Sequence, residues 1–306
     1  MDDQALPSPF VETVLALHGQ RGEVWLRDLP LLLERCARRW DLTEIHQPFH
    51  LSYNYVAPAL HADGAELVLK LGIPHPELLT EIDALRHYDG RGSVRLLDSD
   101  REEGVLLLER LRPGRMLLEV AEEDDEAATA VAAGVMERLW RPAPEEHAFP
   151  TVERWARGLE RLRAHFDGGT GPFPAALVER AEVLFAELLA SQGERVLLHG
   201  DLHHYNILSA ARQPWLAIDP KGVVGERAYE TGALLRNPFS LIERPDLRAV
   251  TVRRVAQLAE RLELDRARIA GWGFAQSVLS AWWLFEDLGQ GWGKWLRLAE
   301  ILAVLG

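Results

Sequence analysis

The sequence contains a single cysteine, Cys36. One thiol cannot form an internal disulfide, and it gives no support for a cysteine-based metal cluster. Cys36 lies in an amphipathic helical pattern that Asp28 and Pro30 open, so we expect a small core residue on a helix packed outside the first lobe. The N-terminal residues MDDQALPSPF lack the features of a secretory signal peptide. These absences predict a cytoplasmic protein.

Long uncharged runs are also scarce. The longest extends from Ile269 to Phe285 and contains Gln276, Ser277 and Ser280. A bilayer requires about 20 consecutive apolar residues, and this run stops short of that length. We therefore interpret it as a buried helix of a soluble protein, and we expect no membrane association.

Positive charge is in short supply as well. The 306 residues contain 34 Lys and Arg against 47 Asp and Glu, which gives a net charge of −13. Binding to nucleic acid requires a basic face, so this balance argues against a nucleic-acid partner. It favours a cationic or neutral small ligand. The length is sufficient for two lobes with separate cores, and we expect the protein to be a monomer.

The stretch most informative about function is RVLLHGDLHHYNILSAARQPWLAIDPK, from Arg195 to Lys221. A buried strand ends at Gly200, and two short apolar segments on either side of a polar turn predict a hairpin. This arrangement is expected to bring Asp201, Asn206 and Asp219 to the end of one small sheet.

These three side chains are of the types that phosphoryl transfer requires. A carboxylate such as Asp201 can orient the acceptor hydroxyl and accept its proton, whereas an amide and a second carboxylate, Asn206 and Asp219, offer the hard oxygen ligands that Mg²⁺ prefers. The alternative interpretation is a hairpin whose carboxylates only cap turns.

The spacing His199-x-Asp201-x-x-x-x-Asn206, followed by Asp219, resembles the catalytic and metal-binding loops of the protein-kinase-like superfamily. The Arg of His-Arg-Asp is absent, and Asp219-Pro220-Lys221 stands in place of Asp-Phe-Gly, which favours antibiotic and small-metabolite kinases. The run from Asp219 to Pro238 resembles the streptomycin 6-kinase and hydroxyurea kinase branch of the aminoglycoside phosphotransferases.

This resemblance implies an α+β, bilobal fold with an antiparallel-sheet N-lobe, one key helix in that lobe, and a mostly helical C-lobe. It implies that Asp201 is the catalytic base and that Asn206 and Asp219 hold Mg²⁺. The implied cosubstrate is ATP or another nucleoside triphosphate. We place the N-lobe at 1–110 and the C-lobe, which would carry the acceptor site, at 111–306.

Lys70 is a candidate for nucleotide binding in the N-lobe. The segments Val56 to Leu60 and Glu66 to Leu71 flank a turn and predict a hairpin. Lys70 lies in the second of these apolar segments, where an inward lysine needs a partner. Glu81 faces inward on the following helix, with Glu77 as the alternative partner. The resemblance implies that Lys70 holds the α- and β-phosphates and that Glu81 orients Lys70 in this nucleotide site; the alternative is a lysine at a solvent-facing edge.

Further nucleotide contacts are expected on two connecting segments. Ser52 and Asn54 lie where a nucleotide-covering loop would be, but this loop has no glycine pattern, so they can equally be ordinary turn residues. The resemblance implies that the backbones of Glu109 and Leu111 bind the adenine ring where the chain crosses between lobes.

Candidate acceptor contacts are acidic. Glu230 closely follows the metal-binding segment, whereas Glu286 and Asp287 follow Trp282 and Trp283 on the last long helix. Carboxylates suit the guanidinium groups of a streptomycin-type acceptor because charge-assisted hydrogen bonds orient such groups. The alternatives are a solvent-facing acidic patch and tryptophans that belong to the core.

We therefore predict a small-molecule kinase that phosphorylates a hydroxyl group of a streptomycin-type aminoglycoside. The alternatives are the same machinery acting on hydroxyurea, an amino alcohol or a sugar metabolite, and a catalytically silent nucleotide-binding protein. The latter disagrees with the presence of all four machinery residues, which are Lys70, Asp201, Asn206 and Asp219.

Overall fold

The chain forms two compact units in a computed structural model that describes residues 6–305. Unit 1 comprises Met1–Gly90 and Val94–Leu111, and unit 2 comprises Arg91–Ser93 and Arg112–Gly306. The segment 91–93 belongs to unit 2 because it pairs with a strand there. The Ala217 N–H donates to the Gly92 carbonyl at 2.8 Å, and Arg212 donates to the Ser93 carbonyl at 3.0 Å.

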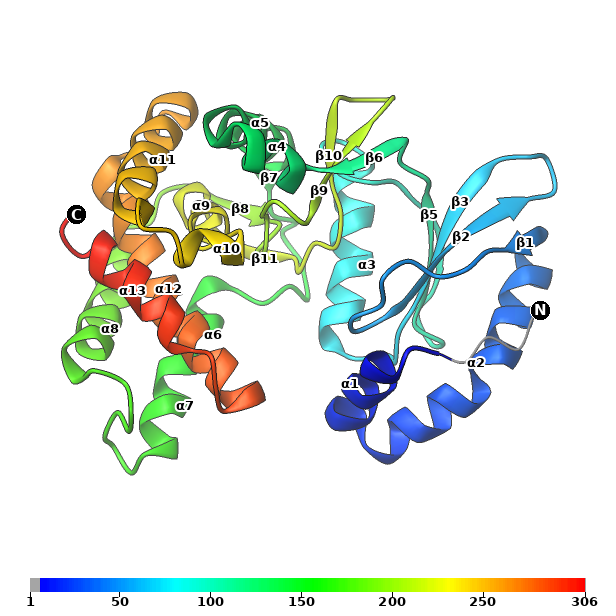
Figure 1. Ribbon diagram of the computed structural model, residues 1–306, viewed down its shortest axis with the longest axis horizontal. Coiled ribbons are helices and arrows are strands. Elements are labelled where there is room, and N and C mark those ends of the chain that lie inside the picture. The colour runs from blue at the N-terminus through cyan, green and yellow to red at the C-terminus, as the bar shows by residue number, and fades with distance from the viewer. Residues whose placement is uncertain (1–5, 306) are drawn as a thin grey trace. The chain divides into compact units, whose positions relative to one another are not determined.

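Unit 1 is built on a five-stranded antiparallel sheet with the order β1-β2-β3-β5-β4 (Figure 1). The expected hairpin is confirmed, because β2 and β3 pair antiparallel and place Val56 opposite Lys70. The elements of the unit are α1 (Ser8–His18), α2 (Gln20–Arg39), β1 (Leu42–Ile45), β2 (Tyr55–His61), β3 (Glu66–Leu71), α3 (Pro76–Tyr88), β4 (Leu96–Asp100) and β5 (Val105–Glu109).

The two faces of this sheet differ in what they bury. Leu69 and Leu71 of β3 join an apolar cluster with Phe10 of α1 and Cys36 of α2. Successive side chains of a strand point to opposite faces, so Lys70 points away from this cluster, towards α3. Burial raises the pKa of the Cys36 thiol to about 11, which agrees with the expected core position.

The start of α2 differs from the sequence-based expectation. The helix begins at Gln20, and Pro30 lies inside it instead of opening it. The break between α1 and α2 falls at Gly19, whose φ of 53° favours glycine. Proline removes one helical hydrogen bond. Here Pro30 is exposed while Leu29 and Leu33 beside it are buried, so packing of the apolar face holds the helix together.

Unit 2 is mostly helical and contains two small antiparallel sheets, β10-β9-β6 and β11-β8-β7. Its strands are β6 (Pro113–Met116), β7 (Arg141–Pro142), β8 (Arg195–Leu198), β9 (Ile207–Ala210), β10 (Trp215–Ala217) and β11 (Val223–Glu226). Its helices are α4 (Leu117–Glu123), α5 (Asp125–Leu139), α6 (Val152–Ala156), α7 (Gly158–His165), α8 (Ala175–Ala190), α9 (Arg227–Leu235), α10 (Phe239–Ile242), α11 (Leu247–Leu262), α12 (Arg266–Leu288) and α13 (Gly293–Leu302).

Helix α12 is the central helix of this unit. It packs against α8, α9 and α13 (Figure 1), and nearly every residue from Ile269 to Trp282 is buried. The uncharged run in the sequence is therefore the core helix that we expected. Among residues 6–305, no helix combines the length and the apolar character needed to span a bilayer.

Candidate active site

Asp201 lies at the end of β8, in a loop whose backbone is held on several sides. Gly200 has a φ of 85°, a conformation that favours glycine, and it turns the chain out of the strand. The Asp201 N–H donates to Nδ1 of His199 at 3.2 Å, and the other ring nitrogen, Nε2, lies 2.8 Å from the Ile218 carbonyl. Burial lowers the pKa of His199 to about 4, so the ring is neutral at pH 7. A neutral ring can accept at Nδ1 and donate at Nε2, which is the pattern found here.

The carboxylate of Asp201 faces two cationic or protonatable groups. Its Oδ1 lies 3.3 Å from a guanidinium nitrogen of Arg236, and its Oδ2 lies 3.5 Å from Nε2 of His203. Burial raises the pKa of Asp201, but His203 and Arg236 outweigh that effect, and the net pKa lies well below its ordinary value. The side chain nevertheless remains 30% exposed. Asp201 is therefore an ionised carboxylate with a face open to a ligand.

Glu230 is hydrogen-bonded to the backbone of this loop. Its Oε2 accepts the His199 N–H at 2.6 Å, and its Oε1 accepts the Gly200 N–H at 2.9 Å. The residue is only 1% exposed. Burial raises the pKa of Glu230 to about 7, although the two backbone hydrogen bonds oppose this shift. Glu230 therefore holds the backbone of the loop that leads into Asp201, and its contact with the acceptor stays a prediction.

Asn206 and Asp219 are brought close to Asp201 by backbone pairing. The side-chain amide of Asn206 donates to the Asp201 carbonyl at 3.0 Å, and the Ile218 N–H donates to the Asn206 carbonyl at 2.9 Å. Asp219 then adopts a φ of 59°, and the Lys221 N–H that follows donates to the His199 carbonyl at 2.8 Å. The expectation of one small sheet is wrong, because β8 pairs with β11 while β9 and β10 form the hairpin of the other sheet.

Unit 1 contains the expected pair of Lys70 and Glu81. The Lys70 Nζ lies 2.7 and 2.8 Å from the two carboxylate oxygens of Glu81, and the two side chains are 4% and 9% exposed. Glu77 is exposed on the same helix. Glu81 is therefore the inward partner of Lys70.

The other predicted nucleotide contacts lie before β2 and at or just after the end of β5. Ser52 is exposed, whereas Asn54 packs so close to Gly72 that a Cβ at that glycine would lie 2.2 Å from Oδ1 of Asn54. The Glu109 N–H donates to the Arg95 carbonyl at 3.1 Å, and Leu111 is buried. Asn54 thus lies against Gly72, and Glu109 lies at the end of β5.

Residues 39–288 match a family model described as aminoglycoside/hydroxyurea antibiotic resistance kinase. The chain is 37% identical over 291 residues to streptomycin 6-kinase of Streptomyces griseus, with 92% of this chain and 91% of the relative covered. It is 36% identical over 294 residues to hydroxyurea phosphotransferase of Kitasatospora aureofaciens, with 92% and 81% covered. The chain belongs to the aminoglycoside/hydroxyurea antibiotic resistance kinase family.

Membership of this kinase family confirms the resemblance found in the sequence, and it makes the chain a small-molecule phosphotransferase. The fold agrees. An amicoumacin kinase solved with AMP-PNP and Ca²⁺ superposes with a TM-score of 0.63 at 18% identity, covering 92% of this chain and 95% of that one. The α+β, protein-kinase-like fold is therefore established.

Two acidic residues predicted to contact the acceptor of this kinase lie at the end of α12. Glu286 forms a two-pronged ion pair with Arg161, at 3.0 and 2.9 Å. Asp287 is exposed. The Glu286 carboxylate is therefore already engaged by a cation of α7.

Sequence reasoning missed Arg236. It lies directly after α9, is 9% exposed, and donates to Gln276 of α12 at 2.9 Å as well as facing Asp201. A signal was available, because Arg236 follows the apolar pair Leu234-Leu235 and precedes Asn237-Pro238. A lone arginine that ends an apolar run must find buried partners.

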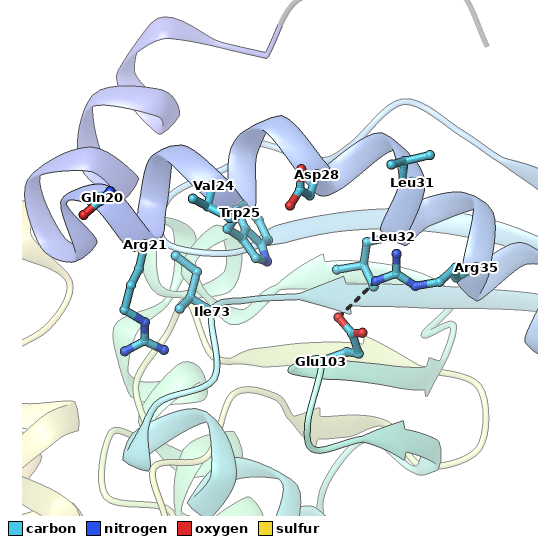
Figure 2. A pocket seen from close by; sticks show the side chains of 10 residues that line it. All are labelled: Gln20, Arg21, Val24, Trp25, Asp28, Leu31, Leu32, Arg35, Ile73 and Glu103. Carbon is cyan, nitrogen blue, oxygen red and sulfur yellow. Dashed lines mark ion pairs between the residues drawn. The ribbon is translucent and has the colours of Figure 1, made fainter.

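A separate pocket of about 670 Å³ lies in unit 1 along α2, and Figure 2 shows the side chains that line it. Arg35 and Glu103, at one end of it, form an ion pair of 3.1 Å. None of the predicted site residues lines this pocket, which is bordered by Gln20, Arg21, Val24, Trp25, Asp28, Leu31, Leu32, Arg35, Ile73 and Glu103.

Proposed function

We propose that this kinase transfers the γ-phosphoryl group of ATP to a hydroxyl group of a streptomycin-type cationic aminoglycoside. The observation that carries the proposal is the Asp201 loop, in which Glu230 accepts the backbone N–H groups of His199 and Gly200 while Arg236 faces the ionised, partly exposed carboxylate of Asp201. Such a rigid acceptor group is suited to binding a hydroxyl group in one orientation.

Asp201 acts by orientation before it acts as a base. Because His203 and Arg236 outweigh burial and lower its pKa, Asp201 is ionised at neutral pH and accepts a hydrogen bond from the attacking hydroxyl. In phosphoryl transfer the transition state is loose, so most of the rate acceleration comes from positioning and charge stabilisation. Asp201 then takes the hydroxyl proton as the new P–O bond forms, while the bond between the γ-phosphorus and the bridging oxygen breaks and ADP leaves.

Asn206 and Asp219 are the proposed ligands of Mg²⁺, which would neutralise phosphate charge when bound. The donor set fits. The Asn206 amide nitrogen donates to the Asp201 carbonyl, which leaves the amide oxygen as the ligand atom, and Asp219 supplies a carboxylate. Within residues 6–305, no three His, Cys, Asp or Glu side chains cluster as a metal site. The remaining ligands are therefore expected from phosphates and water, as is usual for Mg²⁺.

Unit 1 is the proposed nucleotide-binding unit. A lysine buried against Glu81 is held in one position, so Lys70 can present its charge to the α- and β-phosphates of ATP or another nucleoside triphosphate. Ser52 and Asn54 are the proposed contacts to the phosphates, and the backbones of Glu109 and Leu111 to the base. Unit 2 would then carry the acceptor.

Hydroxyurea is the second candidate acceptor, since a hydroxyurea phosphotransferase matches the chain almost as well as a streptomycin 6-kinase does. The two candidates differ in charge, because streptomycin carries guanidinium groups and hydroxyurea is neutral. The net charge of −13 favours the cationic one.

The deciding experiment is turnover with ATP and Mg²⁺ on streptomycin, hydroxyurea and neutral polyols, with the phosphorylated product identified by mass spectrometry. We expect streptomycin to be phosphorylated with the highest kcat/KM. Faster turnover of hydroxyurea would select the second candidate, and the absence of Mg²⁺-dependent ATP consumption with every acceptor would refute the proposed reaction.

A further inference from the structure

Two tryptophans of unit 2 meet edge to face. Trp155 of α6 and Trp283 of α12 have ring centroids 5.6 Å apart and ring planes at 89°. Both are half-buried, whereas the neighbouring Trp282 is 1% exposed and belongs to the core. Part of the aromatic surface of this pair is therefore exposed to solvent.

Helix α6 is anchored to β11 at its start. The Val224 N–H of β11 donates to the Pro150 carbonyl at 2.9 Å, just before the helix begins. Val152 packs so tightly on β11 that a Cβ at Gly225 would lie 2.4 Å from its Cγ2. Strand β11 pairs in turn with β8, which leads into the catalytic loop.

The ring of Trp155 lies against that loop. Its Cη2 atom is 2.8 Å from the position that a Cβ at Gly200 would occupy, and Gly200 directly precedes Asp201. Any larger residue at 200 would collide with the indole. The Trp155 ring therefore lies against the residue that directly precedes Asp201, to which we assign the acceptor hydroxyl.

One ion pair lies beside the two tryptophans. Arg161 binds Glu286 through two hydrogen bonds, and the Arg161 guanidinium and Trp283 Nε1 lie 3.7 and 3.1 Å from the Cβ position of Gly158. Both indoles are partly exposed, and the face of an indole attracts a positive group.

We propose that Trp155 and Trp283 form one wall of the acceptor site and bind a guanidinium or ammonium group of the acceptor through their ring faces. The inference rests on the proposed function and deepens it, because it selects cationic acceptors over neutral ones. A neutral acceptor of similar size gains only apolar contact from the same surface.

The test measures KM for streptomycin and for ATP in Trp155→Leu and Trp283→Leu, with Trp→Phe variants at both positions. We expect the leucine variants to raise the streptomycin KM by about five- to thirtyfold, the range that a partly desolvated cation–π contact supports. The phenylalanine variants should lose less, and the KM for ATP should not change. Trp40→Leu is the matched control, since Trp40 is half-buried in unit 1 and hydrogen-bonds to Asp98.

The inference is overturned if both leucine variants keep the streptomycin KM within twofold of wild type, or if they raise the KM of hydroxyurea as much. Tryptophan fluorescence, titrated with streptomycin without ATP, separates this outcome from failure of the proposed function. Quenching that is lost in the Trp155→Phe, Trp283→Phe double variant supports the wall even if no phosphate is transferred. Unchanged fluorescence in the wild type refutes the wall even if streptomycin is turned over.

Discussion

Each unit holds a carboxylate against a cation, in very different surroundings. In unit 1, Lys70 and Glu81 are 4% and 9% exposed, with Nζ close to both carboxylate oxygens. In unit 2, Asp201 is 30% exposed and faces both Arg236 and His203. The buried Lys70–Glu81 pair contributes chiefly to the folding stability of unit 1, because a buried charge without its partner is very costly. The partly exposed carboxylate of Asp201, which faces two partners, is instead accessible to a ligand. The Lys70–Glu81 pair is therefore tested by measuring stability, and Asp201 by measuring catalysis.

The largest expected effect is on catalysis in unit 2. Asp201→Ala should lower kcat by roughly 10²–10⁴, the usual size of general-base assistance. Because Asp201 is partly exposed, unfolding temperature and nucleotide binding should change little. Steady-state kinetics and calorimetry with ATP check both statements, with Asp201→Asn as the variant of matched shape. Unchanged turnover in Asp201→Ala would remove this carboxylate from the mechanism.

The second prediction concerns the stability of unit 1. Glu81→Gln leaves Lys70 buried without its carboxylate, and breaking such a pair costs about 3–5 kcal/mol. The thiol of Cys36 reports opening of the same unit, because it is buried and its pKa is raised to about 11. We expect faster labelling of Cys36 by a thiol reagent in Glu81→Gln.

Glu12→Gln is the control for this experiment, since Glu12 is exposed on α1 of the same unit. A surface change of this kind should alter stability by no more than about 0.5 kcal/mol. Equal labelling rates in the two variants would show that the Lys70–Glu81 pair does not stabilise unit 1.

The third prediction concerns the support of the catalytic loop. In Glu230→Gln one carboxylate oxygen becomes an NH₂ group, so one of the N–H groups of His199 and Gly200 loses its acceptor. An unsatisfied buried donor costs about 1–3 kcal/mol. We expect a fall in kcat of about tenfold, with the acceptor KM nearly unchanged. A rise in acceptor KM at constant kcat would instead return Glu230 to the acceptor site.

The smallest expected effect is the pH dependence that Glu230 adds to stability. Burial raises its pKa to about 7 from an ordinary value of 4.5, so folding favours its protonated form. This contribution is complete below pH 4.5 and is lost as the pH rises through about 7. The thermal stability of the wild type relative to Glu230→Gln should therefore fall by a few degrees between pH 5 and pH 8. A constant difference across this range would contradict the raised pKa.

Much of this molecule follows from local patterns in the sequence. The apolar strand around Lys70 and the hairpin after Asn206 were predicted because their pairing partners are near in the chain. The pairing of β8 with β11 was missed, since Leu198 and Val223 meet across an intervening hairpin and apolar runs do not specify their partners. The hydrogen bonds of Glu230 were not predicted for a similar reason. Its backbone partners, His199 and Gly200, are set by how α9 packs, which residue types alone do not reveal.

The short segment 91–93 determines how the chain can be divided. The backbone crosses from unit 1 to unit 2 and back around this segment, and crosses again after Leu111. A fragment that ends at Leu111 would carry Gly92 and Ser93 away from Ala217 and Arg212, which bind their carbonyl groups. A fragment that starts at Arg112 would leave the edge of β10 uncovered. The two units are therefore poor candidates for separate expression or for domain exchange between relatives, and a chimaera would need to transplant residues 91–93 together with unit 2.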